Sequence, residues 1–222
     1  MRPLRLAHRG DWRAAPENTI AAMRAALEVP ACDGLEFDVR FAMDGTPVLL
    51  HDPTLERVQG VASPVTEHDV VALARLGVPT LAEVLSAVGR EPFLDIELKA
   101  GPNAELVRVI ETARGSGESR LDRAAISSFD PEILAWVAQR RPVWPRWLNT
   151  RELQTATIER AVDLGCAAVA VLWQALDERS VAEARAAGLD VVAWTVRRGP
   201  TFDRLARLGV KAICVEAAAL DG

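Results

Sequence analysis

Four acidic residues alternate with apolar residues in two short segments of the sequence. Glu36 and Asp38 lie in one segment, and Asp95 and Glu97 lie in the other. Residues two apart in a strand point to the same side, so each segment presents two carboxylates on one face. Crowded carboxylates repel each other and lose hydration, a cost that a divalent cation offsets. We predict that Glu36, Asp38 and Glu97 hold one hard cation, Mg²⁺ or Ca²⁺; a solvated or salt-bridged strand end is the alternative.

Two of the three histidines in the chain stand at the ends of predicted strands. His8 and His51 could act as base and acid around an oxygen-ligated metal, as cleavage of a phosphodiester requires. Arg9 offers a planar fork that fits a phosphate, and Lys99 is a second candidate contact. Either histidine could instead only hydrogen-bond the backbone. The third, His68, is typical of a solvated residue at a helix start.

The elements that must position these side chains alternate between strand and helix along the chain. Eight parallel strands in about this length predict a (β/α)8 TIM barrel, an α/β fold, with a doubly wound open sheet as the alternative. The capping box at Thr80 and the Asp130-Pro131 pair mark two helix starts. The predicted strands are Leu4–His8, Leu35–Arg40, Phe93–Leu98, Ala124–Ser128, Val143–Leu148, Ala168–Leu172, Asp190–Val196 and Lys211–Val215.

A ninth strand candidate, Pro47–His51, follows the second strand too closely for a helix to intervene. We predict a small antiparallel β-hairpin extension there. A two-residue turn at Asp44-Gly45 would place Asp38 directly across from His51.

Composition narrows the classes of protein further. The 222 residues carry a formal net charge of -5 with 26 basic residues scattered among the acidic ones, so nucleic acid is excluded as a partner. No segment has the apolar length of a secretory signal or a membrane span, so we expect a cytoplasmic protein without stable membrane association. The three distant cysteines indicate reduced structural thiols. Residues 1–222 are expected to form a single domain.

The chain resembles the glycerophosphodiester phosphodiesterase family, a group of PLC-like phosphodiesterase TIM barrels, from residue 4 to about residue 210. The resemblance rests on ordered motifs, which are more specific together than any one alone. These motifs are His8-Arg9-Gly10, Pro16-Glu17-Asn18-Thr19, Glu36-Phe37-Asp38-Val39, His51-Asp52-Pro53-Thr54-Leu55, Pro79-Thr80-Leu81-Ala82-Glu83-Val84-Leu85, Glu97-Leu98-Lys99, Ser127-Ser128-Phe129-Asp130 and Trp194-Thr195-Val196.

The resemblance implies metal-dependent hydrolysis of glycerophosphodiesters, such as glycerophosphocholine or glycerophosphoethanolamine, to sn-glycerol 3-phosphate and an alcohol. It implies Glu17 as a polar group that arranges the first loop and Trp194 as a wall for the glycerol. The remaining roles that it implies are metal binding by Glu36, Asp38 and Glu97, acid-base catalysis by His8 and His51, and phosphate contact by Arg9 and Lys99.

The last predicted strand departs from the family pattern, which closes with Thr-Asp and then proline. Here the chain reads Ile213-Cys214-Val215-Glu216-Ala217, and Glu216 could replace the acid or lie on the surface. Two other functions stay open: a lysophospholipase D-type activity at the same site, and a non-catalytic barrel that binds a phosphate ligand. The sequence does not predict an oligomeric state.

Overall fold

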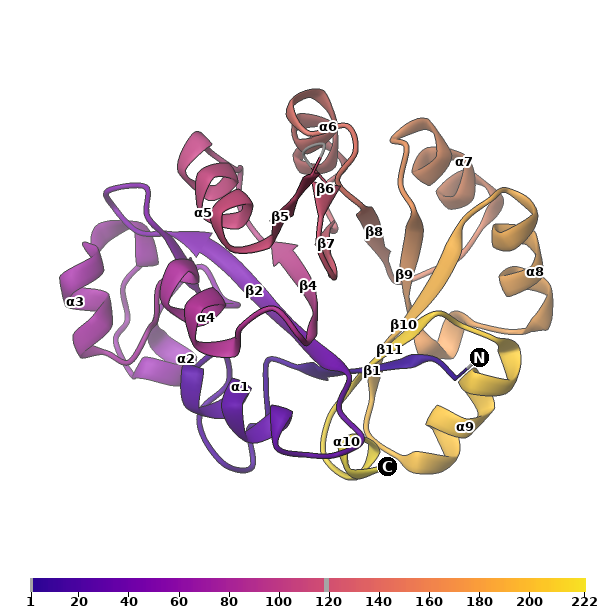
Figure 1. Cartoon of the computed structure of the whole chain (residues 1–222), viewed down its shortest axis with the longest axis horizontal. Coiled ribbons are helices and arrows are strands. Elements are labelled where there is room, and N and C mark those ends of the chain that lie inside the picture. The colour runs from indigo at the N-terminus through magenta and orange to yellow at the C-terminus, as the bar shows by residue number, and fades with distance from the viewer. Residues whose placement is uncertain (1, 118–119) are drawn as a thin grey trace.

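The computed structural model describes residues 2–117 and 120–222, and in them eight parallel strands form a closed barrel (Figure 1). Closure comes from β1, which pairs in parallel with β2 on one side and β11 on the other. The TIM barrel is therefore confirmed, and the open sheet is wrong. In order around the barrel, the strands are β1 (Leu4–His8), β2 (Gly34–Phe41), β4 (Phe93–Leu98), β7 (Ala124–Ser128), β8 (Arg146–Thr150), β9 (Ala168–Leu172), β10 (Asp190–Val196) and β11 (Ala212–Val215).

Helices cover the outside of this barrel, as Figure 1 shows. Two begin where the sequence signals place them: Thr80 forms a capping box with Glu83, and Asp130 caps a helix that starts with Pro131. The longer helices are α1 (Ile20–Leu27), α3 (Val70–Arg75), α4 (Leu81–Val88), α5 (Ala104–Arg114), α6 (Pro131–Arg140), α7 (Thr155–Asp163), α8 (Glu178–Ala186) and α9 (Gly199–Leu208). The short elements are α2 (Glu56–Gln59), α10 (Ala218–Asp221), two 3-10 turns, η1 (Val65–Glu67) and η3 (Trp173–Ala175), and a two-stranded ribbon of β5 (Gly115–Ser116) and β6 (Arg120–Leu121).

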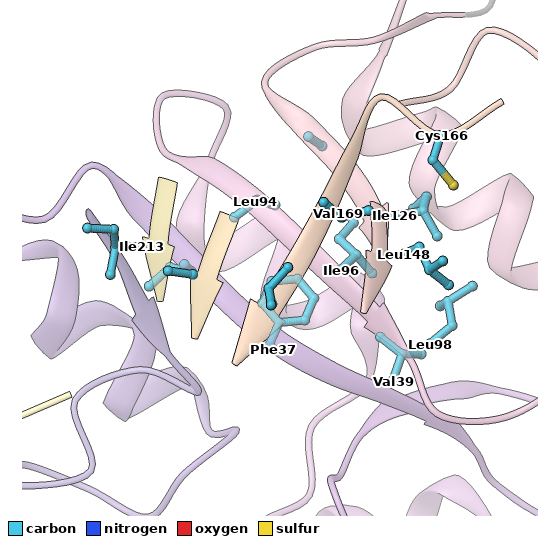
Figure 2. Packing of buried hydrophobic residues seen from close by; sticks show 14 of the residues in the cluster. Phe37, Val39, Leu94, Ile96, Leu98, Ile126, Leu148, Cys166, Val169 and Ile213 are labelled. Atoms are coloured by element: carbon cyan, nitrogen blue, oxygen red, sulfur yellow. The ribbon is translucent and has the colours of Figure 1, made fainter. Parts of the chain in front are cut away.

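In β2 and β4, strict alternation separates outward apolar side chains from inward acidic ones. Phe37, Val39, Ile96 and Leu98 point outward into the layer between strands and helices, where they are buried (Figure 2). The residues between them point into the barrel, whose interior also holds apolar side chains such as Trp147. The outer layer holds the strands rigidly and so fixes where the inward acids stand.

The predicted hairpin exists, but its register differs by one residue. β3 (Pro47–Leu49) pairs antiparallel with β2, with Val39 opposite Leu49. The loop holds three residues, closed by the Ala42 N–H donating to the Thr46 carbonyl, with Gly45 at φ 81°. Asp38 is therefore bonded through its carbonyl to Leu50, not paired with His51, which follows one residue later.

The fifth barrel strand begins later than predicted. It spans Arg146–Thr150, whereas the sequence pattern indicated Val143–Leu148. Pro145 has no N–H to donate to a ladder, and Val143 is about half exposed, so regular pairing begins only after the proline. None of the described helices is long and apolar enough to cross a membrane.

Candidate active site

Three carboxylates meet inside the barrel at the carboxyl ends of β2 and β4. Asp38 is the parallel register partner of Glu97, and Glu36 lies two residues earlier on the same face. One oxygen from each of the three lies within 4.8 Å of the others, and all three residues are buried. Both Glu36 oxygens are buried without a hydrogen-bond partner. Orphaned carboxylate oxygens on one small volume fit a hard divalent cation.

Burial and mutual repulsion govern the electrostatics of the two glutamates in this cluster, whereas nearby cations govern those of Asp38. Burial raises the pKa of Glu36 well above its ordinary value, and the charges of Asp38 and Glu97 add to the effect. Burial also raises the pKa of Glu97. For Asp38, burial is outweighed by nearby cations, first Arg9 and then Lys99, which lower its pKa to about 2. A metal ion would remove the repulsion that the two glutamates experience.

The loop after β1 is shaped to bring Arg9 and Asn18 onto Asp38. Arg9 and Asn18 adopt φ values of 62° and 58°, and Gly10, at φ 82°, packs so closely that an added Cβ would lie 2.6 Å from the Ala22 backbone. Arg9 Nε lies 2.9 Å from Asp38 Oδ2. Asn18 Nδ2 donates to the same oxygen at 2.8 Å, and the Asp38 N–H donates to Asn18 Oδ1. Asp38 is thus held in one orientation.

His8, at the end of β1, is backed by Glu216. Its Nδ1 lies 2.5 Å from Glu216 Oε1, and its Nε2 lies 3.8 Å from Glu36 Oε2, so the ring spans from the closing strand to the acidic cluster. Burial is outweighed by the hydrogen bond to His8, and the charges of His8 and Arg197 help to lower the pKa of Glu216 to about 2. Glu216 therefore stays ionised beside the imidazole at neutral pH.

His51 has a matching arrangement on the other side of the site. Its Nδ1 lies 2.6 Å from Asp52 Oδ1. Asp52 Oδ2 accepts a hydrogen bond from Arg57 Nε, and Arg57 also donates twice to Glu17. Burial, aided by the charges of Arg9 and Lys99, lowers the pKa of His51, against the opposing effect of Asp38.

Glu17 joins the two histidine loops. It accepts from Arg9 Nη1 at 3.1 Å as well as from Arg57. The resulting chain runs from Arg9 through Glu17 and Arg57 to Asp52 and His51. Glu17 thus contacts both loops through arginine side chains.

The remaining predicted residues complete the rim. Lys99 Nζ lies 3.1 Å from Asp38 Oδ1 and is bonded to Glu97. Trp194 donates from its indole N–H to the Ala170 carbonyl, and its ring meets Phe129 edge to face at 5.4 Å. Lys99 and Trp194 both line a cavity of about 160 Å³, which is also lined by His8, His51, Glu36 and Glu97.

Four further residues support the site, and sequence reasoning left them out of it: Asn18, Asp52, Arg57 and Glu216. Asn18 and Asp52 belong to motifs that carry the family resemblance, so their positions in those motifs indicated a place near the site. Glu216 follows Val215, which is the register partner of Ala7 just before His8, and barrel closure therefore makes the two side chains neighbours. Arg57 had no signal, because it reaches the site from a short helix.

A parallel barrel with buried carboxylates between two carboxylate-backed histidines defines a barrel hydrolase of the phosphodiesterase class. The profile of the glycerophosphoryl diester phosphodiesterase family matches residues 8–220. The chain belongs to this family.

Individual relatives agree with this assignment. The chain is 29% identical to a glycerophosphodiester phosphodiesterase of Caldanaerobacter subterraneus subsp. tengcongensis, with 97% of this chain and 95% of that protein aligned. It is 26% identical to a Bacillus subtilis glycerophosphodiester phosphodiesterase over 96% of this chain and 83% of that protein. An Oleispira antarctica phosphodiesterase, solved with the product sn-glycerol-3-phosphate, superposes with a TM-score of 0.83 at 25% identity, covering 96% of this chain and 93% of that one.

Proposed function

We propose that this chain uses one divalent cation, Mg²⁺ or Ca²⁺, to hydrolyse glycerophosphodiesters such as glycerophosphocholine and glycerophosphoethanolamine to sn-glycerol 3-phosphate and an alcohol. The observation that carries the proposal is the group of three buried carboxylates, with orphaned oxygens, set between two histidines. Every group in this proposal belongs to the barrel, so we further propose that residues 1–222 act as one catalytic domain.

The cation would be held by Glu36, Asp38 and Glu97. When bound, it would supply positive charge that offsets the charge of the substrate phosphate. Arg9 and Lys99, which reach Asp38 from the loops after β1 and β4, are the proposed phosphate contacts, and Trp194 is the proposed wall for the glycerol.

His8 and His51 are the proposed acid-base pair. Each is bonded through Nδ1 to a carboxylate, which leaves Nε2 to exchange a proton with the substrate. One histidine would remove a proton from the attacking oxygen, and the other would protonate the leaving alcohol oxygen. The attacking oxygen is either water or the glycerol hydroxyl of the substrate; in the second case a quenched reaction contains a cyclic glycerophosphate.

The test is release of glycerol 3-phosphate by chelated enzyme to which Mg²⁺ or Ca²⁺ is returned. We expect His51→Ala to lose roughly 10²- to 10⁴-fold in kcat. His68→Ala is the matched control, because His68 lines neither cavity at the site and bonds Ser63 instead. Full activity in His51→Ala would refute the assigned role. No hydrolysis of any diester with either metal would favour a binding protein, and faster turnover of lysophosphatidylcholine than of glycerophosphocholine would favour the lysophospholipase D activity.

A further inference from the structure

A second and larger cavity, of about 720 Å³, opens beside the proposed catalytic site. The two cavities share His8, Arg9, Trp194 and Thr195 as a common wall. The smaller cavity is lined by Glu36, Glu97 and His51, so a phosphate bound there at the shared wall would direct one of its two ester arms into the larger cavity. The difference in volume assigns the compact glycerol to the smaller cavity and the variable alcohol to the larger one.

The charges that line the larger cavity are paired with one exception. Arg57 is bonded to Glu17 and Asp52, and Arg197 is bonded to Glu216. Arg198 is exposed and lines the cavity, yet its guanidinium has no hydrogen bond or ion pair with any residue in 2–117 or 120–222. The unmatched charge that faces the bound alcohol is therefore positive.

The N-terminus of α9 adds positive charge at the same part of the cavity. Arg198 is the N-cap residue of α9, which has no side-chain cap, and Thr201 in the first turn of α9 also lines the cavity. The N-terminus of a helix carries partial positive charge. An anion bound at Arg198 would therefore lie close to the guanidinium and to the N-terminus of α9.

Two of the three tryptophans that line this cavity already contact other side chains, and the third, Trp12, is 48% exposed, where solvent weakens a cation–π contact with a quaternary ammonium group. Trp173 already has the Arg204 guanidinium 5.6 Å from its ring centroid, and the ring of Trp194 packs against Phe129. Both acids at the cavity, Glu17 and Glu216, are engaged by arginine or histidine. A cationic head group would therefore find no free counter-charge and one repelling arginine.

We propose that the larger cavity is the alcohol subsite and that Arg198 makes the enzyme select diesters whose alcohol carries a carboxylate or a phosphate. This inference rests on the proposed diesterase function and names its substrate class. Two substrate pairs isolate the added anion. Glycerophosphoserine differs from glycerophosphoethanolamine by a carboxylate, and glycerophosphoinositol 4-phosphate differs from glycerophosphoinositol by a phosphate.

The experiment measures kcat/KM for both pairs with wild-type enzyme, Arg198→Gln and Arg151→Gln. Arg151 is the matched control, since it is also exposed but lines only the smaller cavity. We expect wild type to favour the anionic member of each pair and Arg198→Gln to reduce that preference roughly two- to fivefold, the range for an exposed ion pair. Arg151→Gln should keep the wild-type preference. High salt should weaken the preference of the wild type toward that of Arg198→Gln.

The outcomes distinguish failure of the alcohol subsite from failure of the diesterase function. Wild-type enzyme that hydrolyses these diesters with a preference unchanged by Arg198→Gln refutes the subsite alone. A preference that Arg151→Gln abolishes and Arg198→Gln does not would place the alcohol in the smaller cavity and also refute it. If Arg198→Gln reduces the preference in only one substrate pair, the subsite is restricted to the anion of that pair. Wild-type enzyme that hydrolyses none of the four diesters refutes the function and the subsite together.

Discussion

The contact between Glu216 and His8 gives the sharpest test of the site. Glu216→Gln keeps the length of the side chain and an oxygen that can accept a hydrogen bond, but it removes the negative charge 2.5 Å from His8 Nδ1. The amide cannot stabilise a protonated imidazole as the carboxylate does. We therefore expect a loss in turnover without a loss of fold.

The size of the loss follows from the pKa of Glu216. A fall from the ordinary value of 4.5 to about 2 corresponds to about 3 kcal/mol in favour of the ionised carboxylate at this nearly buried position. Arg197 contributes part of it, so we assign about 1.5 to 2.5 kcal/mol to His8. Glu216→Gln should then lower kcat by roughly 10- to 100-fold.

Two control variants decide whether the effect passes through His8. Arg197→Gln removes the partner of the other Glu216 oxygen, but Arg197 has a side chain 71% exposed, so its loss should cost less than about threefold. Glu216→Asp restores the charge on a shorter side chain and should recover part of the activity. Glycerol 3-phosphate release at saturating metal and thermal melting would be measured together. Wild-type kcat in Glu216→Gln, or an equal loss in Arg197→Gln, would refute the reasoning.

Three further predictions concern other parts of the molecule. Asn18→Ala removes the two hydrogen bonds between Asn18 and Asp38, so metal affinity measured by calorimetry should fall about 10- to 100-fold; unchanged affinity would contradict this. Burial raises the pKa of Cys166 to about 11, so its contribution to stability is complete below about pH 9, the unfolded value, and is lost as pH rises through 11. Denaturant unfolding should show a fall of about 2 to 3 kcal/mol over that range that is missing in Cys166→Ala. Phe37→Ala empties a fully buried position and should lower the free energy of unfolding by about 3 to 5 kcal/mol, and a loss under 1 kcal/mol would mean that the outer layer repacks.

The alternating pattern of β2 and β4 was enough to predict which side chains enter the barrel. A period of two fixes the face of every residue once the strand is recognised, so Glu36, Asp38 and Glu97 could be grouped before any tertiary contact was known. The hairpin shows the limit of local rules. Asp44-Gly45 suits a two-residue and a three-residue loop alike, and the choice between them moves His51 by one position relative to Asp38.

The contacts that sequence could not supply are those made by long side chains from distant elements. Arg57 lies on a short helix, 40 residues from Glu17. Its side chain contacts Glu17 only because of the way the segment after the hairpin packs. No periodicity describes such a contact. The same holds for the cavity beside Arg198, whose walls come from the loops after β1, β9 and β10 together with Arg57 and Glu216.

The position of Glu216 shows that the candidate site depends on closure of the barrel. His8 and Glu216 are 208 residues apart, and only the pairing of β1 with β11 brings them together. The register places Glu216 one residue beyond the paired Ala7 and Val215, and so puts its carboxylate on the His8 imidazole. At the strand end where the sequence departs from the family pattern, this chain therefore still holds a carboxylate beside His8.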